Sequence, residues 1–310
     1  MDCTPRLQPV DIGPVRLEDP VILAPMSGVT DMPFRQMVKR DGAGLVVSEM
    51  IASAAMVREN RKTLLMAKNS PEEFPMSVQL AGCEPEVMAE AAKLNEDRGA
   101  AIIDINFGCP VKKVVNGHAG SSLMRDEVHA AKILEATVKA VKLPVTLKMR
   151  TGWDRANRNA PNLARIAEQC GIKMLTVHGR TRCQFYDGHA DWAFVADVKA
   201  GDQAAGHRQR RHQHARRRRR GARAIGRRRR DDRPRRLRPA VVPQPGDPLS
   251  ARPASGWPIR RWPSSTPRCA STSRRCCRIT AQETGVRMAR KHLGWYSKGL
   301  PALGRVPRQR

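Results

Sequence analysis

A single cysteine at the end of an apolar run is the residue in this chain most suited to chemistry. The run Ala101-Ile102-Ile103 leads into Asp104-Ile105-Asn106, and Gly108-Cys109-Pro110 then turns the chain. An apolar run of this kind bounded by Gly and Pro predicts a buried strand, and the turn would leave the Cys109 thiol exposed at its carboxyl end. A thiol with a free pKa of about 8.5 is mostly protonated at neutral pH and can act as a general acid. The alternative is a small buried apolar residue, which is the usual role of a lone cysteine.

The elements that must position Cys109 alternate along the first 200 residues. Short apolar segments predict six strands, over about residues 21–24, 44–48, 75–80, 101–106, 143–148 and 173–178. Each segment precedes a helical pattern, over about residues 31–39, 52–66, 84–98, 126–142, 158–170 and 191–199. This alternation indicates βα units and a parallel sheet of the α/β class. Six such units fit a (β/α)8 TIM barrel better than a short open sheet.

The charge distribution divides the chain at about residue 200. Residues 1–200 contain 26 Lys and Arg against 24 Asp and Glu, whereas residues 201–310 contain 31 against 5. Residues 201–278 contain 24 Arg and no Lys. Strands seven and eight of a barrel should lie there, but neither is recognisable, and the Arg- and Pro-rich composition predicts disorder. In residues 279–310, the segment Ala281–Trp295 predicts an amphipathic basic helix.

The sequence argues against several other classes of protein. The eight cysteines form no C-x-x-C pair and no Cys/His spacing suited to zinc, so no metal site is expected. The N-terminus has no basic region followed by an apolar core, and no run of about 18 apolar residues occurs. We therefore expect no signal peptide and no membrane span. A cytoplasmic, monomeric protein with free thiols is the resulting expectation.

Polar and turn-forming residues follow the other predicted strands. In a parallel barrel, the carboxyl ends of the strands form the functional face. Besides Cys109, the residues expected at that face are Pro25, Met26, Ser27, Gln79, Asn106, Lys148, Arg150, His178 and Arg180. Such a set could bind a flat, polar, anionic cofactor and supply one acid.

Together these motifs resemble the tRNA-dihydrouridine synthase family, and specifically its bacterial B-type branch. The segments that carry the resemblance are Leu23–Asp31, Ser77–Leu80, Asn106–Pro110, Leu147–Trp153, Val177–Thr181 and Gly285–Tyr296. The resemblance implies a TIM barrel with a small C-terminal helical domain that binds tRNA. It also implies an oxidoreductase acting on CH–CH groups, in which FMN, recharged by NADPH, reduces the C5–C6 bond of a tRNA uridine. Hydride would go from flavin N5 to C6, and Cys109 is similar to the family's donor of the proton to C5.

The resemblance further implies roles for the other residues at the functional face. Those expected to contact the flavin are Pro25, Met26, Ser27, Gln79, Lys148 and His178. An amide suits the pyrimidine edge because it both donates and accepts, and a lysine can place positive charge beside N1 and O2. Those expected to contact the uridine or the rest of the tRNA are Asn106, Arg150, Arg180, Lys112, Lys113, Arg287, Arg290 and Lys291. For each residue, an ordinary turn, core or solvated role is the alternative.

The tract 201–278 departs from the family pattern. The resemblance implies an Asn-Gly-Asp segment and a Gly-Arg pair at the ends of strands seven and eight, where they would bind the FMN phosphate. The tract has no Asn-Gly-Asp segment, and its Gly226-Arg227 pair begins an arginine run and follows no recognisable strand. We hypothesise that this tract is read out of frame, from about Lys199 to about Ile279, because GC-rich codons read out of frame give Arg, Pro, Ala and Gly. A barrel interrupted in this way would have open sheet edges. We therefore expect the chain as written to fold poorly, bind little flavin and lack activity.

Two other functions remain open at this point. One is a flavoprotein that acts on free pyrimidines, like the dihydroorotate dehydrogenases, although a free base needs no basic C-terminal helix. The other is a non-enzymatic RNA-binding protein in which residues 208–238 form a disordered arginine-rich arm that binds phosphates. That arm contains no aromatic residue on which bases could stack.

Overall fold

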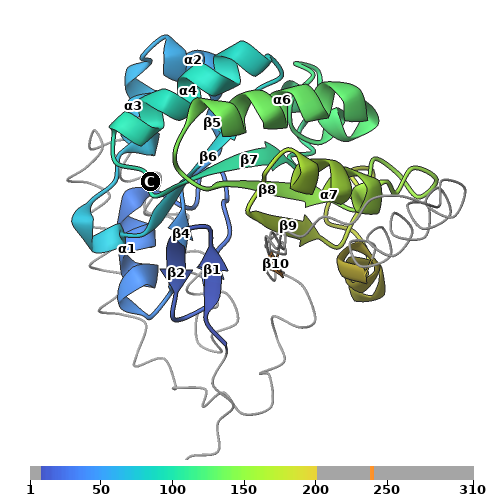
Figure 1. Ribbon diagram of the computed structural model, residues 1–310, viewed down its shortest axis with the longest axis horizontal. Helices are drawn as coiled ribbons and strands as arrows, with labels where there is room; N and C mark the ends of the chain where they lie inside the picture. The colour runs from blue at the N-terminus through green and yellow to red at the C-terminus, as the bar shows by residue number, and fades with distance from the viewer. Residues whose placement is uncertain (1–7, 201–237, 241–310) are drawn as a thin grey trace, which may run out of the picture.

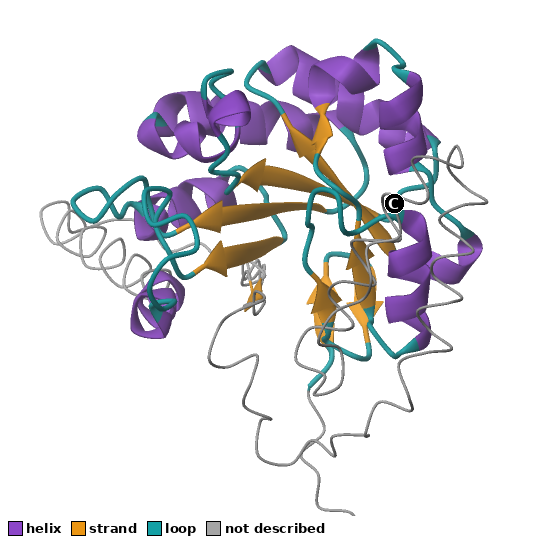
Figure 2. Ribbon diagram, turned by 180° about the vertical axis from the view of Figure 1, so that it is seen from behind, coloured by secondary structure: helices purple, strands orange, loops and turns teal. Residues whose placement is uncertain are grey.

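The computed structural model describes residues 8–200 and 238–240 of the chain, which form a curved sheet with helices along its outer side (Figure 1). The sheet order is β10-β9-β8-β7-β6-β4-β3, and β5 also pairs with β6. The strands are β3 Ile22–Leu23, β4 Leu45–Val47, β5 Ile51–Ala52, β6 Met76–Ala81, β7 Ile102–Phe107, β8 Val145–Arg150, β9 Met174–His178 and β10 Arg238–Ala240. Every pair is parallel, as Figure 2 shows from behind. This half-barrel confirms the predicted α/β class.

The helices follow the strands as the sequence predicts. They are α1 Met32–Arg40, α2 Ser53–Val57, α3 Arg61–Ala67, α4 Pro85–Asp97, α5 Lys112–Val115, α6 Glu127–Ala140 and α7 Ala160–Gln169, with 3-10 turns η1 Pro71–Glu73 and η2 Gly120–Arg125. Residues 192–200 are also helical. Aspartates begin two of the longer helices, because Asp31 Oδ1 accepts from Phe34 N at 3.1 Å and Asp126 Oδ1 accepts from His129 N at 2.9 Å.

The helix predicted over 52–66 is instead two helices, α2 and α3. Glu59 adopts a φ of 49°, which a right-handed helix does not tolerate. Asn60 then caps α3, since its Oδ1 accepts from Lys62 N at 3.0 Å. An amide that bonds the backbone locally competes with helical bonding, and this competition explains the break.

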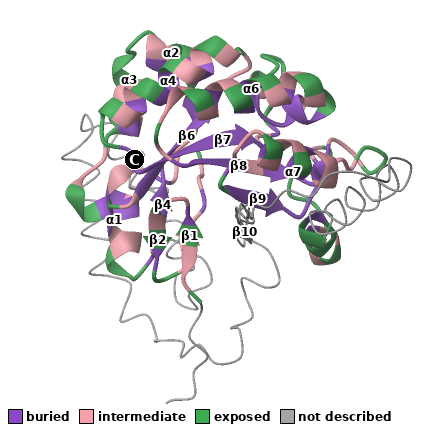
Figure 3. Ribbon diagram, in the orientation of Figure 1, coloured by how far each residue is buried: buried purple, intermediate pink, exposed green. Residues whose placement is uncertain are grey.

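The core lies between the sheet and its outer helices. All residues of β6, β7 and β9 are buried (Figure 3). Ile103, Ile105 and Leu147 face the same apolar cluster as Ile133 of α6, and each has 0% exposure. Strands covered on both faces are expected to read as continuous apolar runs, which is why the sequence located them well.

A β-hairpin that the sequence analysis did not identify precedes the sheet. Its strands β1 Val10–Ile12 and β2 Val15–Leu17 are antiparallel. Ile12 and Leu17 pack in one cluster with Leu45, Ile102 and Met174, residues at the amino ends of the parallel strands. The hairpin therefore covers the amino-terminal end of the half-barrel.

No strand is recognisable from the sequence within residues 201–278, but the structure places the short strand β10 there. Arg238, Pro239 and Ala240 lie opposite Met174, Leu175 and Thr176 of β9. The physical reason is that a sheet edge offers backbone N–H and C=O groups, which pair with an extended segment of almost any composition. A search for apolar periodicity does not detect such a strand.

An ion pair is buried beneath α1, next to the turn that follows β3. The Arg35 and Glu73 side chains are 1% and 0% exposed, and Arg35 Nε donates to Glu73 Oε1 at 2.6 Å. Arg35 also donates to the carbonyl oxygens of Thr30 at 2.9 Å and Lys68 at 2.8 Å. Its guanidinium thus fixes the 26–30 turn to the loop before β6.

Candidate functional site

The turn that carries Cys109 is held from two sides. The backbone N–H groups of Gly108 and Cys109 donate to Asn106 Oδ1 at 3.0 and 2.9 Å. On the other side, Ser121 donates to the Cys109 carbonyl from Oγ at 2.8 Å and from its backbone N–H at 3.1 Å. These bonds fix the backbone of the cysteine at the carboxyl end of β7.

The Cys109 side chain is half-buried, whereas the sequence predicts an exposed thiol. The correction follows from the approach of η2, which begins at Gly120 and passes against the cysteine. A Cβ at Gly120 would lie 2.9 Å from the Cys109 carbonyl oxygen and 3.2 Å from Cys109 Cβ. Only glycine permits so close an approach, and its φ of 63° is also left-handed.

A chain of side-chain hydrogen bonds leads from the interior of the sheet to this turn. Asp104 accepts from Thr146 Oγ1 and from Gln79 Nε2, each at 2.6 Å. Gln79 Oε1 in turn accepts from Asn106 Nδ2 at 2.7 Å. Asp104, Gln79 and Asn106 are 6%, 1% and 8% exposed. Three buried polar groups on adjacent strands therefore satisfy one another, as buried polar groups must.

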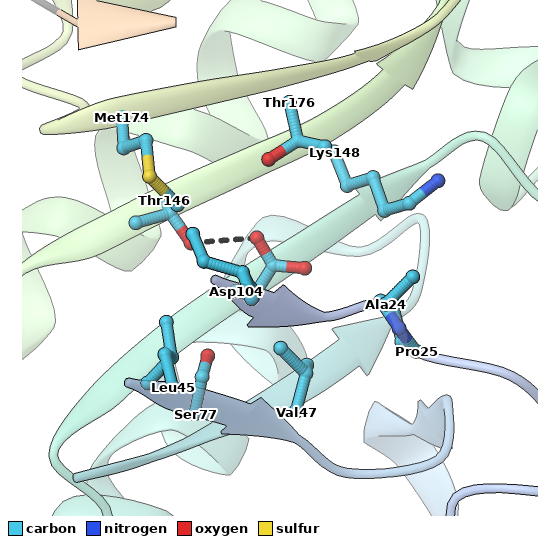
Figure 4. Close-up of a pocket in the computed structure, with 11 residues that line it drawn as sticks. Ala24, Pro25, Leu45, Val47, Ser77, Asp104, Thr146, Lys148, Met174 and Thr176 are labelled. Carbon is cyan, nitrogen blue, oxygen red and sulfur yellow. Dashed lines mark hydrogen bonds between the residues drawn. The ribbon is translucent and has the colours of Figure 1, made fainter. Parts of the chain in front are cut away.

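Lys148 and Asp104 line a cavity on the inner side of the sheet (Figure 4). The other residues that line it are Ile22, Ala24, Pro25, Leu45, Val47, Ser77, Thr146, Met174 and Thr176. The ammonium of Lys148 is half-buried, and no hydrogen bond joins it to another residue in the described part of the chain. Burial and, to a smaller extent, the charge of the nearby Arg150 together lower its pKa to about 8, against the opposing charge of Asp104.

Burial also raises the pKa of the Asp104 carboxyl, while the hydrogen bonds from Thr146 and Gln79 and the charge of Lys148 oppose the rise. This aspartate was not singled out from the sequence. A carboxylate inside an otherwise apolar strand is the signal that could have identified it, because such a group is almost never buried without partners.

Arg150, the last residue of β8, connects three backbone segments through hydrogen bonds. Its side chain donates to the carbonyl oxygens of Gly108 at 2.8 Å, Thr181 at 2.9 Å and Phe185 at 2.7 Å. Burial lowers its pKa to about 10. The predicted contact with the uridine would have to use the N–H groups that these carbonyls leave free.

His178, at the end of β9, is a buried neutral imidazole. Its Nε2 lies 3.2 Å from a terminal nitrogen of Arg180. Arginine can only donate, so Nε2 accepts and the ring proton is on Nδ1. Burial, together with Arg150, Lys148 and Arg180, lowers the pKa of His178 to about 3. Arg180 also donates to the Gly188 carbonyl at 2.9 Å.

The turn after β3 brings Pro25, Met26 and Ser27 to the same end of the sheet. Met26 O accepts from Val29 N and Thr30 N, both at 3.0 Å. Pro25 lines the cavity beside Lys148, as Figure 4 shows, while Ser27 is exposed. The turn thus presents backbone and side-chain groups toward the interior and toward solvent.

The residues expected to meet the rest of an RNA are only partly described by the structure. Lys112 and Lys113 begin α5, three and four residues after Cys109, and both are exposed. Arg287, Arg290 and Lys291 lie outside the described residues. Within residues 8–200, no group of three or more His, Cys, Asp or Glu side chains could hold a metal ion. No helix in the same part of the chain is both long enough and apolar enough to cross a bilayer.

Comparison with known proteins gives consistent matches over the barrel segment. The family described as "Dihydrouridine synthase (Dus)" matches residues 22–202. A probable tRNA-dihydrouridine synthase of Rickettsia bellii is 65% identical over 191 residues, which are 61% of this chain and 59% of the relative. A tRNA-dihydrouridine synthase B of Xanthomonas axonopodis is 56% identical over 62% of this chain and 58% of the relative. That of Pseudomonas aeruginosa is 55% identical over 61% and 57%. The matched part of the chain thus spans just under three fifths of these relatives.

Proposed function

Because this chain belongs to the dihydrouridine synthase family, as its motifs predicted, we propose that it reduces the C5–C6 bond of uridines in tRNA to give 5,6-dihydrouridine. The observation that carries the proposal is the position of Cys109. Its half-buried thiol lies at the carboxyl end of β7, on a turn that Asn106 and Ser121 hold in place. A thiol fixed at the functional face of a parallel barrel is suited to deliver a proton to C5.

Lys148, which lines the cavity, and Gln79, which is hydrogen-bonded to Asp104 of the lining, suit the pyrimidine edge of a flavin. Gln79 keeps one N–H and one lone pair without a partner among the described residues, so it can still donate and accept. The Lys148 ammonium carries a positive charge that would stabilise the negative charge of a reduced flavin at N1 and O2. The proposed contacts to FMN are Pro25, Met26, Ser27, Gln79, Lys148 and His178. Bound there, FMN supplies a two-electron reduction, with NADPH as the proposed source of electrons.

The protonation states of the neighbouring side chains leave Cys109 as the proposed acid. His178 has a pKa of about 3, so near neutral pH it carries no proton that it could release readily. Lys148 has a pKa of about 8 and remains mostly protonated, which suits a group that holds charge beside the cofactor. Cys109 is the proposed donor of the proton to C5 of the base. A positioned general acid of this kind contributes about 10²–10⁴ in rate.

We propose that the tRNA meets the protein at the same end of the barrel. Asn106 and Arg150 form hydrogen bonds with the turn of Cys109, and Arg180 follows β9. A uridine must be unstacked from its RNA to reach them. The exposed Lys112 and Lys113 would contact phosphates, as would Arg287, Arg290 and Lys291 of the helix predicted from the sequence. A monomeric, metal-free, cytoplasmic enzyme remains part of this proposal.

We also propose that residues 1–200 are the catalytic unit, that residues 201–278 are aberrant, and that residues 279–310 are the remnant of a tRNA-binding domain. The family match ends at residue 202, which supports the first boundary. Sequencing the gene across this tract tests the reading-frame hypothesis. The flavin absorbance of the purified chain tests whether the loss of the phosphate-binding motifs lowers flavin binding.

The activity is tested with unmodified tRNA, FMN and NADPH, followed by mass spectrometry of the nucleosides. The full chain is compared with a version in which residues 201–278 are replaced by the equivalent segment of the Rickettsia bellii relative. We expect dihydrouridine from the repaired version, a loss of about 10²–10⁴ in rate for Cys109→Ala, and little change for Cys183→Ala. Cys183 is the matched control because its thiol is exposed and has no assigned role.

Two results would contradict the proposed function. Reduction of free uracil without reduction of tRNA would favour the free-pyrimidine flavoprotein. RNA binding that disappears on deletion of 201–278, with no reduction by the repaired version, would favour a non-enzymatic binding protein.

A further inference from the structure

We propose that Asp104 is a positioning residue for Cys109, acting through Gln79 and Asn106. This inference rests on the proposed function only for the role of the thiol. The series of hydrogen bonds from Asp104 to the turn of Cys109 is present in the folded protein whatever its function. It connects β7 to β6, returns to β7, and ends at the turn that bears the cysteine.

Donor and acceptor are fixed for every hydrogen bond in this series, because the groups at its two ends can each play only one role. At the turn, the N–H groups of Gly108 and Cys109 can only donate, so Asn106 must present Oδ1 to them. Asn106 Nδ2 then points to Gln79, which must present Oε1. Gln79 Nε2 consequently needs an acceptor, and the Asp104 carboxyl supplies one.

Strand register explains why the three side chains meet. Gln79 of β6 lies opposite Asp104 of β7 in the parallel pairing. Asn106 follows Asp104 by two residues, so both side chains are on the same face of β7. Gln79 is therefore placed to bond with both of them.

Asp104 is itself held by a second donor, Thr146 Oγ1 of β8 at 2.6 Å. The carboxyl is 6% exposed, so water contributes little to satisfying it. An apolar residue at position 104 would provide no acceptor for Gln79 Nε2. The Gln79 side-chain amide would then be free to rotate. Asn106 would then lose a fixed partner, and the turn of Cys109 would open more often.

The test compares Asp104→Leu with the parent full-length chain. Leu has the same branching as Asp but cannot accept a hydrogen bond. Amide hydrogen exchange is followed by NMR at Gly108 and Cys109, and the alkylation rate of Cys109 is followed by peptide mass spectrometry. Neither readout requires tRNA, flavin or turnover, so a failure here is distinct from a failure of the proposed activity. We expect exchange at these two amides to rise about twofold to tenfold, and alkylation of Cys109 to rise with it.

Two further variants keep the test decisive. Gln79→Met removes the hydrogen bonds of Gln79 to both Asp104 and Asn106. It is expected to raise exchange at the same two amides, and it provides the test where Asp104→Leu does not fold. Thr137→Val removes a buried hydroxyl bond to Ile133 O on α6, remote from the turn, and controls for general loss of stability. Unchanged exchange at Gly108 and Cys109 in both Asp104→Leu and Gln79→Met would overturn the proposal. An equal rise at all core amides, or the same local rise in Thr137→Val, would also overturn it.

Discussion

The half-buried ammonium of Lys148 makes the fold sensitive to pH in a direction that can be calculated. Its pKa falls from 10.5 to about 8, with burial as the largest cause. Each pKa unit corresponds to about 1.4 kcal/mol, so the displacement amounts to about 3 kcal/mol of free energy of unfolding. The unfolded chain holds this proton more tightly than the folded chain, and folding is therefore opposed at neutral pH.

The sign follows from proton binding. Between about pH 8 and pH 10.5 the unfolded chain binds more protons at Lys148 than the folded chain, so this residue makes stability rise with pH there. Below about pH 8 the cost is fully present. Lys148→Met removes the charged group, and we expect it to raise the free energy of unfolding at about pH 7 by up to about 3 kcal/mol.

Urea titrations of the full chain and of Lys148→Met at about pH 7 and about pH 10 measure this effect. The difference between the two proteins should shrink at the higher pH, because the parent chain no longer has to keep the ammonium charged. Lys132→Met is the matched control, since Lys132 is exposed on α6 and should change stability by less than about 0.5 kcal/mol. A variant that is less stable than the parent, or a difference that does not depend on pH, would refute the reasoning.

Three further predictions concern the surroundings of the site. Glu73→Ala leaves the Arg35 guanidinium buried without its carboxylate and should lower the free energy of unfolding in urea by about 3–5 kcal/mol; a loss below about 1 kcal/mol would argue against a tightly paired charge. Because the pKa of His178 is about 3, its ring ¹⁵N shifts should stay constant between about pH 5 and pH 8, and a titration in that range would show that the ring is not buried as described. In Gly152→Ala, the new Cβ would overlap the backbone carbonyl of Asn157, so thermal unfolding should show a loss of about 1–3 kcal/mol.

The parallel strands β4, β6, β7, β8 and β9 could be predicted from the sequence because nearly all of their residues are buried and they therefore read as apolar runs. The predicted strands at 101–106 and 173–178 agree within one residue with β7 and β9. The β1–β2 hairpin was missed because each strand has three residues and its place depends on contacts with distant strand ends. Short segments of that kind carry too little periodicity to be recognised.

The site was predicted as a set of residue types but not as a set of partners. Asn106 and His178 lie within one residue of the carboxyl ends of β7 and β9, as the sequence predicts, whereas Gln79 and Lys148 lie two residues before the ends of β6 and β8. The bond between Gln79 and Asp104 depends on the register of two neighbouring strands, which local sequence does not specify. The burial of the Cys109 thiol likewise depends on Gly120, which approaches it from the next element of the fold.

The β1–β2 hairpin gives the interior of the sheet a floor at the end opposite Cys109. A ligand of the proposed site that entered from the carboxyl end would meet, at its deepest point, the apolar side chains packed around Ile12 and Leu17. Residues from the start of the chain therefore close the end of the interior that lies farthest from the thiol.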